Sequence, residues 1–72
     1  MAVVRILVSI SDDYLDRLSE VSEQLQASGM KIEQVLSTLG VITGEIDAEN
    51  LSALQTVAGV SNLEEEKPFE AL

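Results

Sequence analysis

The sequence predicts a single α+β domain, in which a four-stranded antiparallel sheet carries two helices on one face. Stretches rich in β-branched residues alternate with amphipathic stretches in the order β-α-β-β-α-β. The chain has 72 residues, which is enough for one domain. Hydrophobic residues make up 46% of the chain and aromatic residues only 3%, so the core must be built from Val, Ile and Leu. Such a composition is typical of a folded chain rather than a disordered one.

The first predicted elements are a strand over residues 3–10 and a helix over residues 12–28. The strand is indicated by β-branched residues that recur at every second position. Ser11 stands where a helix N-cap is expected, and acidic residues follow in the first turn, where the helix dipole favours them. Apolar residues at spacings of three and four continue the helix, and Gly29 ends it.

Residues 31–46 predict a hairpin of two strands that turns near residues 39–41. The apolar residues of the first half do not keep one parity, so we expect a bulge or a register shift there. The second half is β-branched. Gly44 inside it indicates that a helix approaches closely.

The last predicted elements are a helix over residues 48–58 and a strand over residues 60–66. Asp47 would cap this helix, apolar residues form one stripe along it, and Gly59 ends it. Three successive glutamates in the final stretch favour an edge strand, because charged side chains keep an exposed edge from pairing.

Two strand-helix-strand units in so short a chain, each with a right-handed crossover, predict the split βαβ or ferredoxin-like sandwich. Its first and third strands would be central, and its second and fourth would lie at the edges. The face without helices should display Leu7, Val41 and Thr43. We expect residues 1–66 to form this domain and residues 67–72 to leave it as an extended C-terminal arm.

The charge of the chain excludes some classes of partner. Four basic residues stand against 13 acidic ones, which gives a net charge of −9. A polyanion cannot neutralise phosphates, so we expect it to bind neither nucleic acid nor anionic membranes. No stretch reaches the roughly 20 apolar residues of a membrane span, and the N-terminal stretch lacks the basic region of a signal peptide. A soluble, cytoplasmic protein is expected.

The residue types also leave little catalytic chemistry. The chain has no Cys and no His, which excludes disulfides, thiolate metal sites, cysteine nucleophiles and imidazole bases. A Schiff-base lyase or aldolase would depend on Lys31 or Lys67. Both lie in polar stretches with nothing to desolvate the amine, and solvated surface lysines are the expected alternative. We therefore expect no enzyme activity and no cofactor.

No metal or phosphate site is predicted either. Asp12, Asp13 and Asp16 lack the ligand spacing and the loop glycine of an EF-hand-like site, and acids at a helix start explain them better. Successive side chains of a strand point to opposite faces, so the glutamates of residues 64–66 are better explained by a solvated edge than by a calcium site. The glycines near residues 40–44 do not match a phosphate-binding loop.

The C-terminal arm has two interpretations. Pro68 fixes its own φ and biases the residue before it away from helix, so the arm should be extended. An extended arm can add to the sheet edge of another protein, and the single Phe of the chain, Phe69, lies on it. The alternative is a terminus that has no partner.

The region from the second helix to the last strand has the most specific pattern. A helix leucine is followed by a short turn, a valine, two spacer residues, a hydrophobic residue and acids: Leu54, Gly59, Val60, Leu63, Glu64 and Glu65. Together with the opening strand, the helix that ends at Gly29 and the hairpin that contains Gly44, this pattern makes the sequence resemble the propeptides of subtilisin-like serine proteases and the related stand-alone proteinase inhibitors. The likeness covers almost the whole chain.

This resemblance implies a subtilisin-like protease as the partner. In that family the tail lies substrate-like in the protease cleft, while the sheet packs on two protease helices. Leu72 would then occupy the primary specificity pocket and Ala71 the next subsite, while Glu70 would point outward and Phe69 would fill the fourth subsite. Glu64, Glu65 and Glu66 match the acids that cap the N-termini of protease helices, which is favourable on dipole grounds.

The sequence thus leads to two hypotheses of function. The first is a stand-alone, propeptide-like inhibitor or folding chaperone, which binds a subtilisin-like protease through its sheet face and its C-terminal arm. The second is a regulatory or oligomerisation module. It would use the open sheet face to form a homodimer or to bind a small ligand, since an apolar patch on a monomer usually has a partner.

Overall fold

The structure is a computed structural model that describes residues 2–66 of the chain. It contains four strands, two α-helices and two short 3₁₀ helices, labelled η. In chain order these are β1 (Val3–Ile10), η1 (Asp12–Arg17), α1 (Leu18–Ala27), β2 (Lys31–Leu36), β3 (Val41–Asp47), η2 (Ala48–Asn50), α2 (Leu51–Leu54) and β4 (Val60–Glu66).

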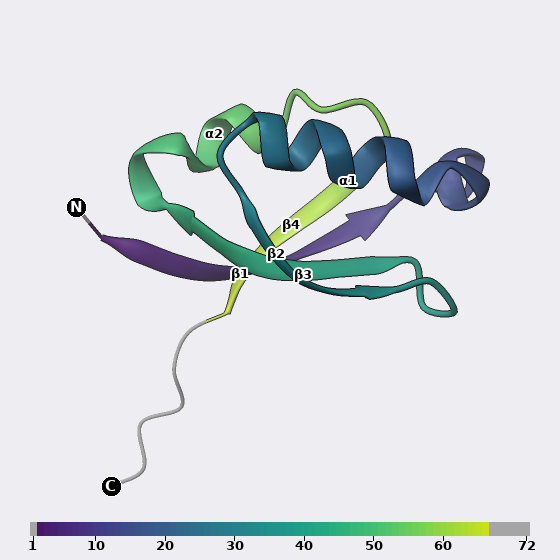
Figure 1. Cartoon of the computed structure of the whole chain (residues 1–72), viewed down its shortest axis with the longest axis horizontal. Coiled ribbons are helices and arrows are strands. Elements are labelled where there is room, and N and C mark those ends of the chain that lie inside the picture. Colours follow the sequence, from purple (N-terminus) through teal and green to yellow (C-terminus); the bar gives the residue numbers. More distant parts are fainter. Residues whose placement is uncertain (1, 67–72) are drawn as a thin grey trace, which may run out of the picture.

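The four strands form one sheet in the order β2-β3-β1-β4, and each neighbouring pair is antiparallel. Both helices lie on the same face of this sheet (Figure 1). The predicted α+β class, the ferredoxin-like arrangement and the central positions of the first and third strands are confirmed. Within residues 2–66, no helix is long and apolar enough to cross a membrane.

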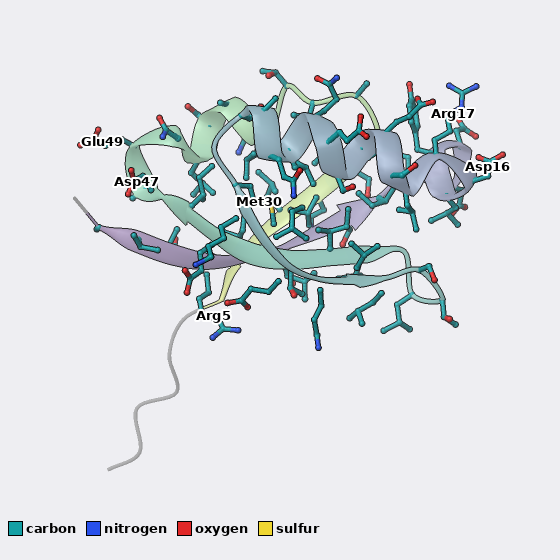
Figure 2. All side chains as sticks on the ribbon, in the orientation of Figure 1. Arg5, Asp16, Arg17, Met30, Asp47 and Glu49 are labelled. Atoms are coloured by element: carbon teal, nitrogen blue, oxygen red, sulfur yellow. The ribbon has the colours of Figure 1, made fainter. Side chains whose placement is uncertain are left out.

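The core lies between the helices and the sheet, and it is aliphatic as the composition predicts. Alternate residues of β1 and β3 point into it, because successive side chains of a strand lie on opposite faces. The helices and the residue before β2 supply the rest; Met30 lies between the two layers (Figure 2). The buried hydrophobic side chains of the described residues are Ile6, Val8, Ile10, Val21, Leu25, Met30, Ile42, Ile46 and Leu54.

The first helix is not continuous over residues 12–28 as predicted. Residues Asp12–Arg17 form a 3₁₀ helix, and the α-helix begins only at Leu18. Arg17 separates the two with φ −126° and ψ 32°, outside the α region. No side chain of η1 is fully buried; Tyr14 is partly buried and packs against the core, so the core constrains this segment less than it constrains α1. Three aspartates, which are weak helix formers, add to this preference.

The second helix is shorter than the predicted residues 48–58, because α2 ends at Leu54. The next residues make bonds to the carbonyl three positions earlier, as from Gln55 N to Ser52 O and from Val57 N to Leu54 O. The hydroxyl of Thr56 also donates to Ala53 O over 2.8 Å. β-Branched residues and such local bonds disfavour a continued α-helix.

The two predicted N-caps mark the correct boundaries but do not cap with their side chains. Ser11 precedes η1 and Asp47 precedes η2, and neither side chain bonds a helix N–H. Instead, the backbone carbonyl of Ser11 accepts a hydrogen bond from the backbone N–H of Tyr14 over 2.9 Å. Short 3₁₀ turns take the place of the α-helical first turns that a side-chain cap would serve.

The hairpin of β2 and β3 confirms the expected irregularity and corrects its turn. The pairing register shifts between Ile32 and Gln34, which leaves Glu33 as the extra residue. The turn covers residues 37–40 rather than 39–41, and Gly40 ends it with φ +67°. Gly44 is closely approached by β2 rather than by a helix. A Cβ there would collide with the Lys31 carbonyl oxygen and lie 2.9 Å from Met30 Cε.

Candidate functional site

The face of the sheet that is opposite the helices is the candidate functional site, called here the open face. Three rows of residues cross it, because partners on neighbouring strands share a face. The middle row runs from Gln34 through Thr43 and Leu7 to Glu64. Leu7 and Thr43 are direct partners at the centre of the sheet, and both are partly exposed.

A second row lies toward the β2–β3 turn. Leu36 pairs with Val41, Val41 with Ser9, and Ser9 with Asn62. The three residues predicted for this face, Leu7, Val41 and Thr43, therefore lie together on it. Leu36 extends their apolar surface to the β2 edge. Its place could not be read from the sequence, because the register shift in β2 changes the face to which each later side chain belongs.

The third row is charged, and the sequence reasoning did not single it out. Lys31 pairs with Glu45, and Glu45 pairs with Arg5, so that the charge alternates from β2 to β3 to β1. Arg5 also forms an ion pair with Glu33, with 2.7 Å between Nη2 and Oε1. Figure 2 shows Arg5 on the side away from the helices. Since β3 separates β1 from β2, the guanidinium reaches across β3 to make this contact.

The predicted capping acids do not all lie on one face of the sheet. Glu64 and Glu65 are both exposed on β4, but Glu64 is opposite Leu7 on the open face and Glu65 is opposite Ile6 on the helix side. Glu66 ends the strand opposite Arg5. A partner on the open face would therefore meet Glu64 and not Glu65.

The predicted arm residues, Phe69, Glu70, Ala71 and Leu72, lie outside the described residues, as does Lys67. Lys31, the other lysine considered for a Schiff base, is exposed in the charged row of the open face. Within residues 2–66, no group of three or more His, Cys, Asp or Glu side chains is placed to hold a metal ion. Asp12, Asp13 and Asp16 are exposed on η1.

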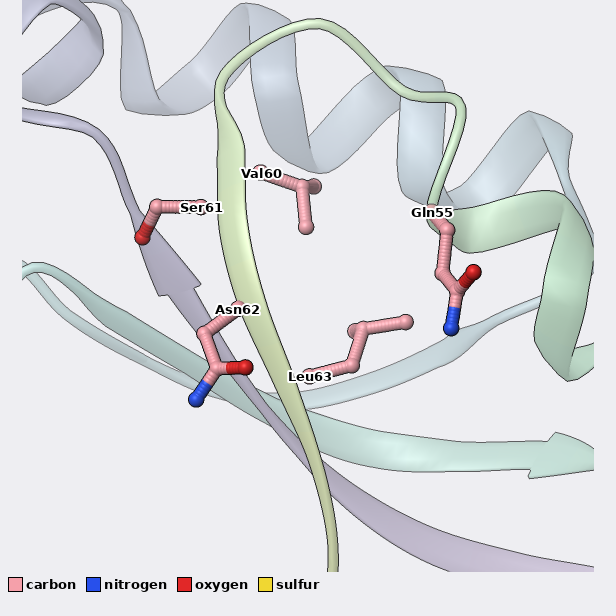
Figure 3. A pocket seen from close by; sticks show the side chains of 5 residues that line it. All are labelled: Gln55, Val60, Ser61, Asn62 and Leu63. Atoms are coloured by element: carbon pink, nitrogen blue, oxygen red, sulfur yellow. The ribbon is translucent and has the colours of Figure 1, made fainter.

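The described residues line several hollows on the surface. One of about 260 Å³ lies beside β4, where Gln55 faces Val60 and Leu63 across an open gap (Figure 3). Its other lining residues are Ser61 and Asn62, so its polar side chains are amides and a hydroxyl. The Ser61 hydroxyl donates to Ser9 O over 3.2 Å, and no base lines the hollow to activate it.

A wider hollow of about 450 Å³ lies along η1 and α1 and is lined by Tyr14, Arg17, Glu20 and Val21 among others. Arg17 Cζ is 5.7 Å from the centre of the Tyr14 ring, which is within the range of a cation–π contact. This contact explains the positions of the Tyr14 and Arg17 side chains as packing within η1. The open face therefore stays the more distinctive surface for function.

Comparisons with protein-family models, with curated proteins and with solved structures found no match to this chain. The fold described above therefore stands on the structure itself, and the function has to be argued from the open face and the sequence.

Proposed function

We propose that this chain is a non-catalytic binding protein, which inhibits a subtilisin-like serine protease or assists its folding. The open face would pack on the protease surface, and the C-terminal residues would enter the protease cleft. The observation that supports this most is the position of β4, which is both the last strand and an edge strand. β4 therefore ends, at Glu66, on an edge of the sheet that borders the open face.

The open face suits a helical partner surface. Leu7, Val41 and Leu36 supply a partly exposed apolar centre. Glu64 lies beside this centre on the β4 side. A carboxylate in this place can accept hydrogen bonds from the free N–H groups at the N-terminus of a partner helix. That end of the helix also carries a partial positive charge.

The arm would act as a product-like ligand. By the resemblance, Leu72 would fill the primary specificity pocket and Phe69 the fourth subsite. Subtilisins prefer apolar groups at both positions, and both side chains are apolar. The arm would add as a strand beside the cleft, so that main-chain bonds give affinity and alternate side chains give specificity.

The experiment is a titration of a broad-specificity subtilisin with the full chain at fixed substrate concentration. A variant that lacks residues 69–72 runs beside it. Inhibition by the full chain that is lost on truncation is the expected result. An absence of inhibition at tens of micromolar, together with no effect on refolding of the protease, would contradict the proposal. Equal inhibition by both forms would contradict insertion of the arm.

A matched pair of variants tests the open face. Glu64→Gln and Glu65→Gln make the same isosteric change on neighbouring residues of one strand, whose side chains lie on opposite faces. A helix-terminus contact is worth about 0.3–1 kcal/mol. Glu64→Gln should therefore weaken inhibition by about two- to fivefold, and Glu65→Gln should leave it unchanged. Equal effects of the two changes would count against docking through the open face.

A further inference from the structure

Charged residues of opposite sign alternate in one row of the open face. Lys31, Glu45 and Arg5 follow one another across β2, β3 and β1. Two of the three basic residues within residues 2–66 lie in this row, although the net charge of the chain is −9. The row therefore places cations beside anions on the part of the surface that the helices leave uncovered.

We infer that two copies of this chain pack their open faces together about a two-fold axis, which runs along the strands between β3 and β1. This rotation lays β1 of one copy over β3 of the other. Arg5 then faces the partner's Glu45, and Glu45 faces the partner's Arg5. Because the interface is isologous, each such contact is made twice.

The same rotation also sets the contacts of the uncharged rows. Leu7 lies over the partner's Thr43, and Val41 lies over the partner's Ser9. Packed sheets lie about 10 Å apart and cross at roughly 30°, so facing rows coincide best near the axis and diverge toward the edges. The central strands β1 and β3 supply all of these contacts, and they lie next to the axis.

The charges distinguish this axis from the other two-fold arrangement of two stacked sheets. An axis perpendicular to the strands, through the row of Leu7 and Thr43, would place Arg5 over the partner's Ser9. It would also place Glu45 over the partner's Val41, so that neither charge would meet an opposite charge across the interface.

The size of the open face sets the expected affinity. Four strands about 4.8 Å apart and some six residues long give a face of about 19 by 20 Å. Such a footprint of about 400 Å² per copy is below that of a standard stable interface, so only a weak, reversible dimer is expected. This dimer does not depend on a protease partner.

Sedimentation of the full chain at low salt, from about 10 μM to 1 mM, tests the dimer. The wild type should sediment as a reversible monomer–dimer mixture. Arg5→Glu and Glu45→Arg should each weaken association about tenfold or more, since each creates two like-charge contacts across the axis. The double variant should recover most of the loss, because it restores opposite charges. A monomeric wild type, or single variants that associate like the wild type, would overturn the inference.

Crosslinking provides a measurement that does not depend on the charge variants. The chain has no native Cys, so one introduced Cys is a clean probe. Leu7→Cys should crosslink between copies with a short bismaleimide, since the two positions lie about 11 Å apart across the axis. Val35→Cys is the matched control, because this exposed strand residue pairs with the buried Ile42 on the helix side. Equal crosslinking at both positions, or none at Leu7→Cys, would overturn the inference.

Discussion

Gly44→Ala tests how tightly the two strands of the hairpin are packed. Gly44 lies in the central strand β3, between Ile6 and Ile32, and it is buried. Its φ is not positive, so the backbone itself admits alanine and only the space is limiting. The new Cβ would collide with the Lys31 carbonyl oxygen, which is backbone and cannot rotate away, and would press on Met30. Overpacking of this kind costs about 1–3 kcal/mol.

That cost is large for this chain, because a core of this size supplies only about 3–5 kcal/mol of net stability. Urea unfolding followed by far-UV circular dichroism measures it. With a slope of about 1 kcal/mol per M, the midpoint should fall by about 1–3 M. Thr43→Ala, on the open side of the same strand, is the control and should cost about 1 kcal/mol or less. A free energy of unfolding for Gly44→Ala within about 0.5 kcal/mol of wild type would refute the steric reasoning.

Other changes test the core, the surface ion pair and the two uses of the open face. Leu54→Ala removes the one side chain of α2 that is fully buried, so the free energy of unfolding should fall by about 2–4 kcal/mol. A urea titration should then find much of the protein unfolded at low urea. A loss under about 1 kcal/mol would contradict this expectation. Arg5→Ala breaks a pair whose side chains are 56% and 31% exposed, so the free energy of unfolding should fall by about 1 kcal/mol or less, and a larger loss would show a greater structural role. Active-site-blocked subtilisin should reduce the crosslinking of Leu7→Cys, because the protease and the partner copy would compete for one face. Unchanged crosslinking at a saturating concentration of the protease would show that the two partners use different surfaces.

The strands follow from the sequence because their pattern is local. Alternate residues of β1 are buried, and the β-branched stretches near Val41 and Val60 form strands as predicted. The order of the strands follows from the handedness of the two crossovers, which leaves few alternatives in so short a chain. This is why Leu7 and Thr43 could be placed on the open face before the structure was known.

The helices and the charged row depended on information that is not local. The spacing of apolar residues does not distinguish an α-helix from 3₁₀ turns, so both helices were predicted too long. The charged row needs the exact register of three strands, and the irregularity at Glu33 changes that register within β2. The parity of Arg5 with Leu7 was a signal for part of this row, but the partners of Arg5 could come only from the structure.

The position of β1 also has a consequence for how the chain folds. β1 is the first strand, yet it lies inside the sheet between β3 and β4. One side of β1 is completed only by residues 60–66, which come 50 or more positions later. Until β4 is synthesised, β1 has an unpaired edge, and that edge can pair with strands of other chains. Any fragment that ends before β4 should therefore aggregate, whatever the finished protein binds.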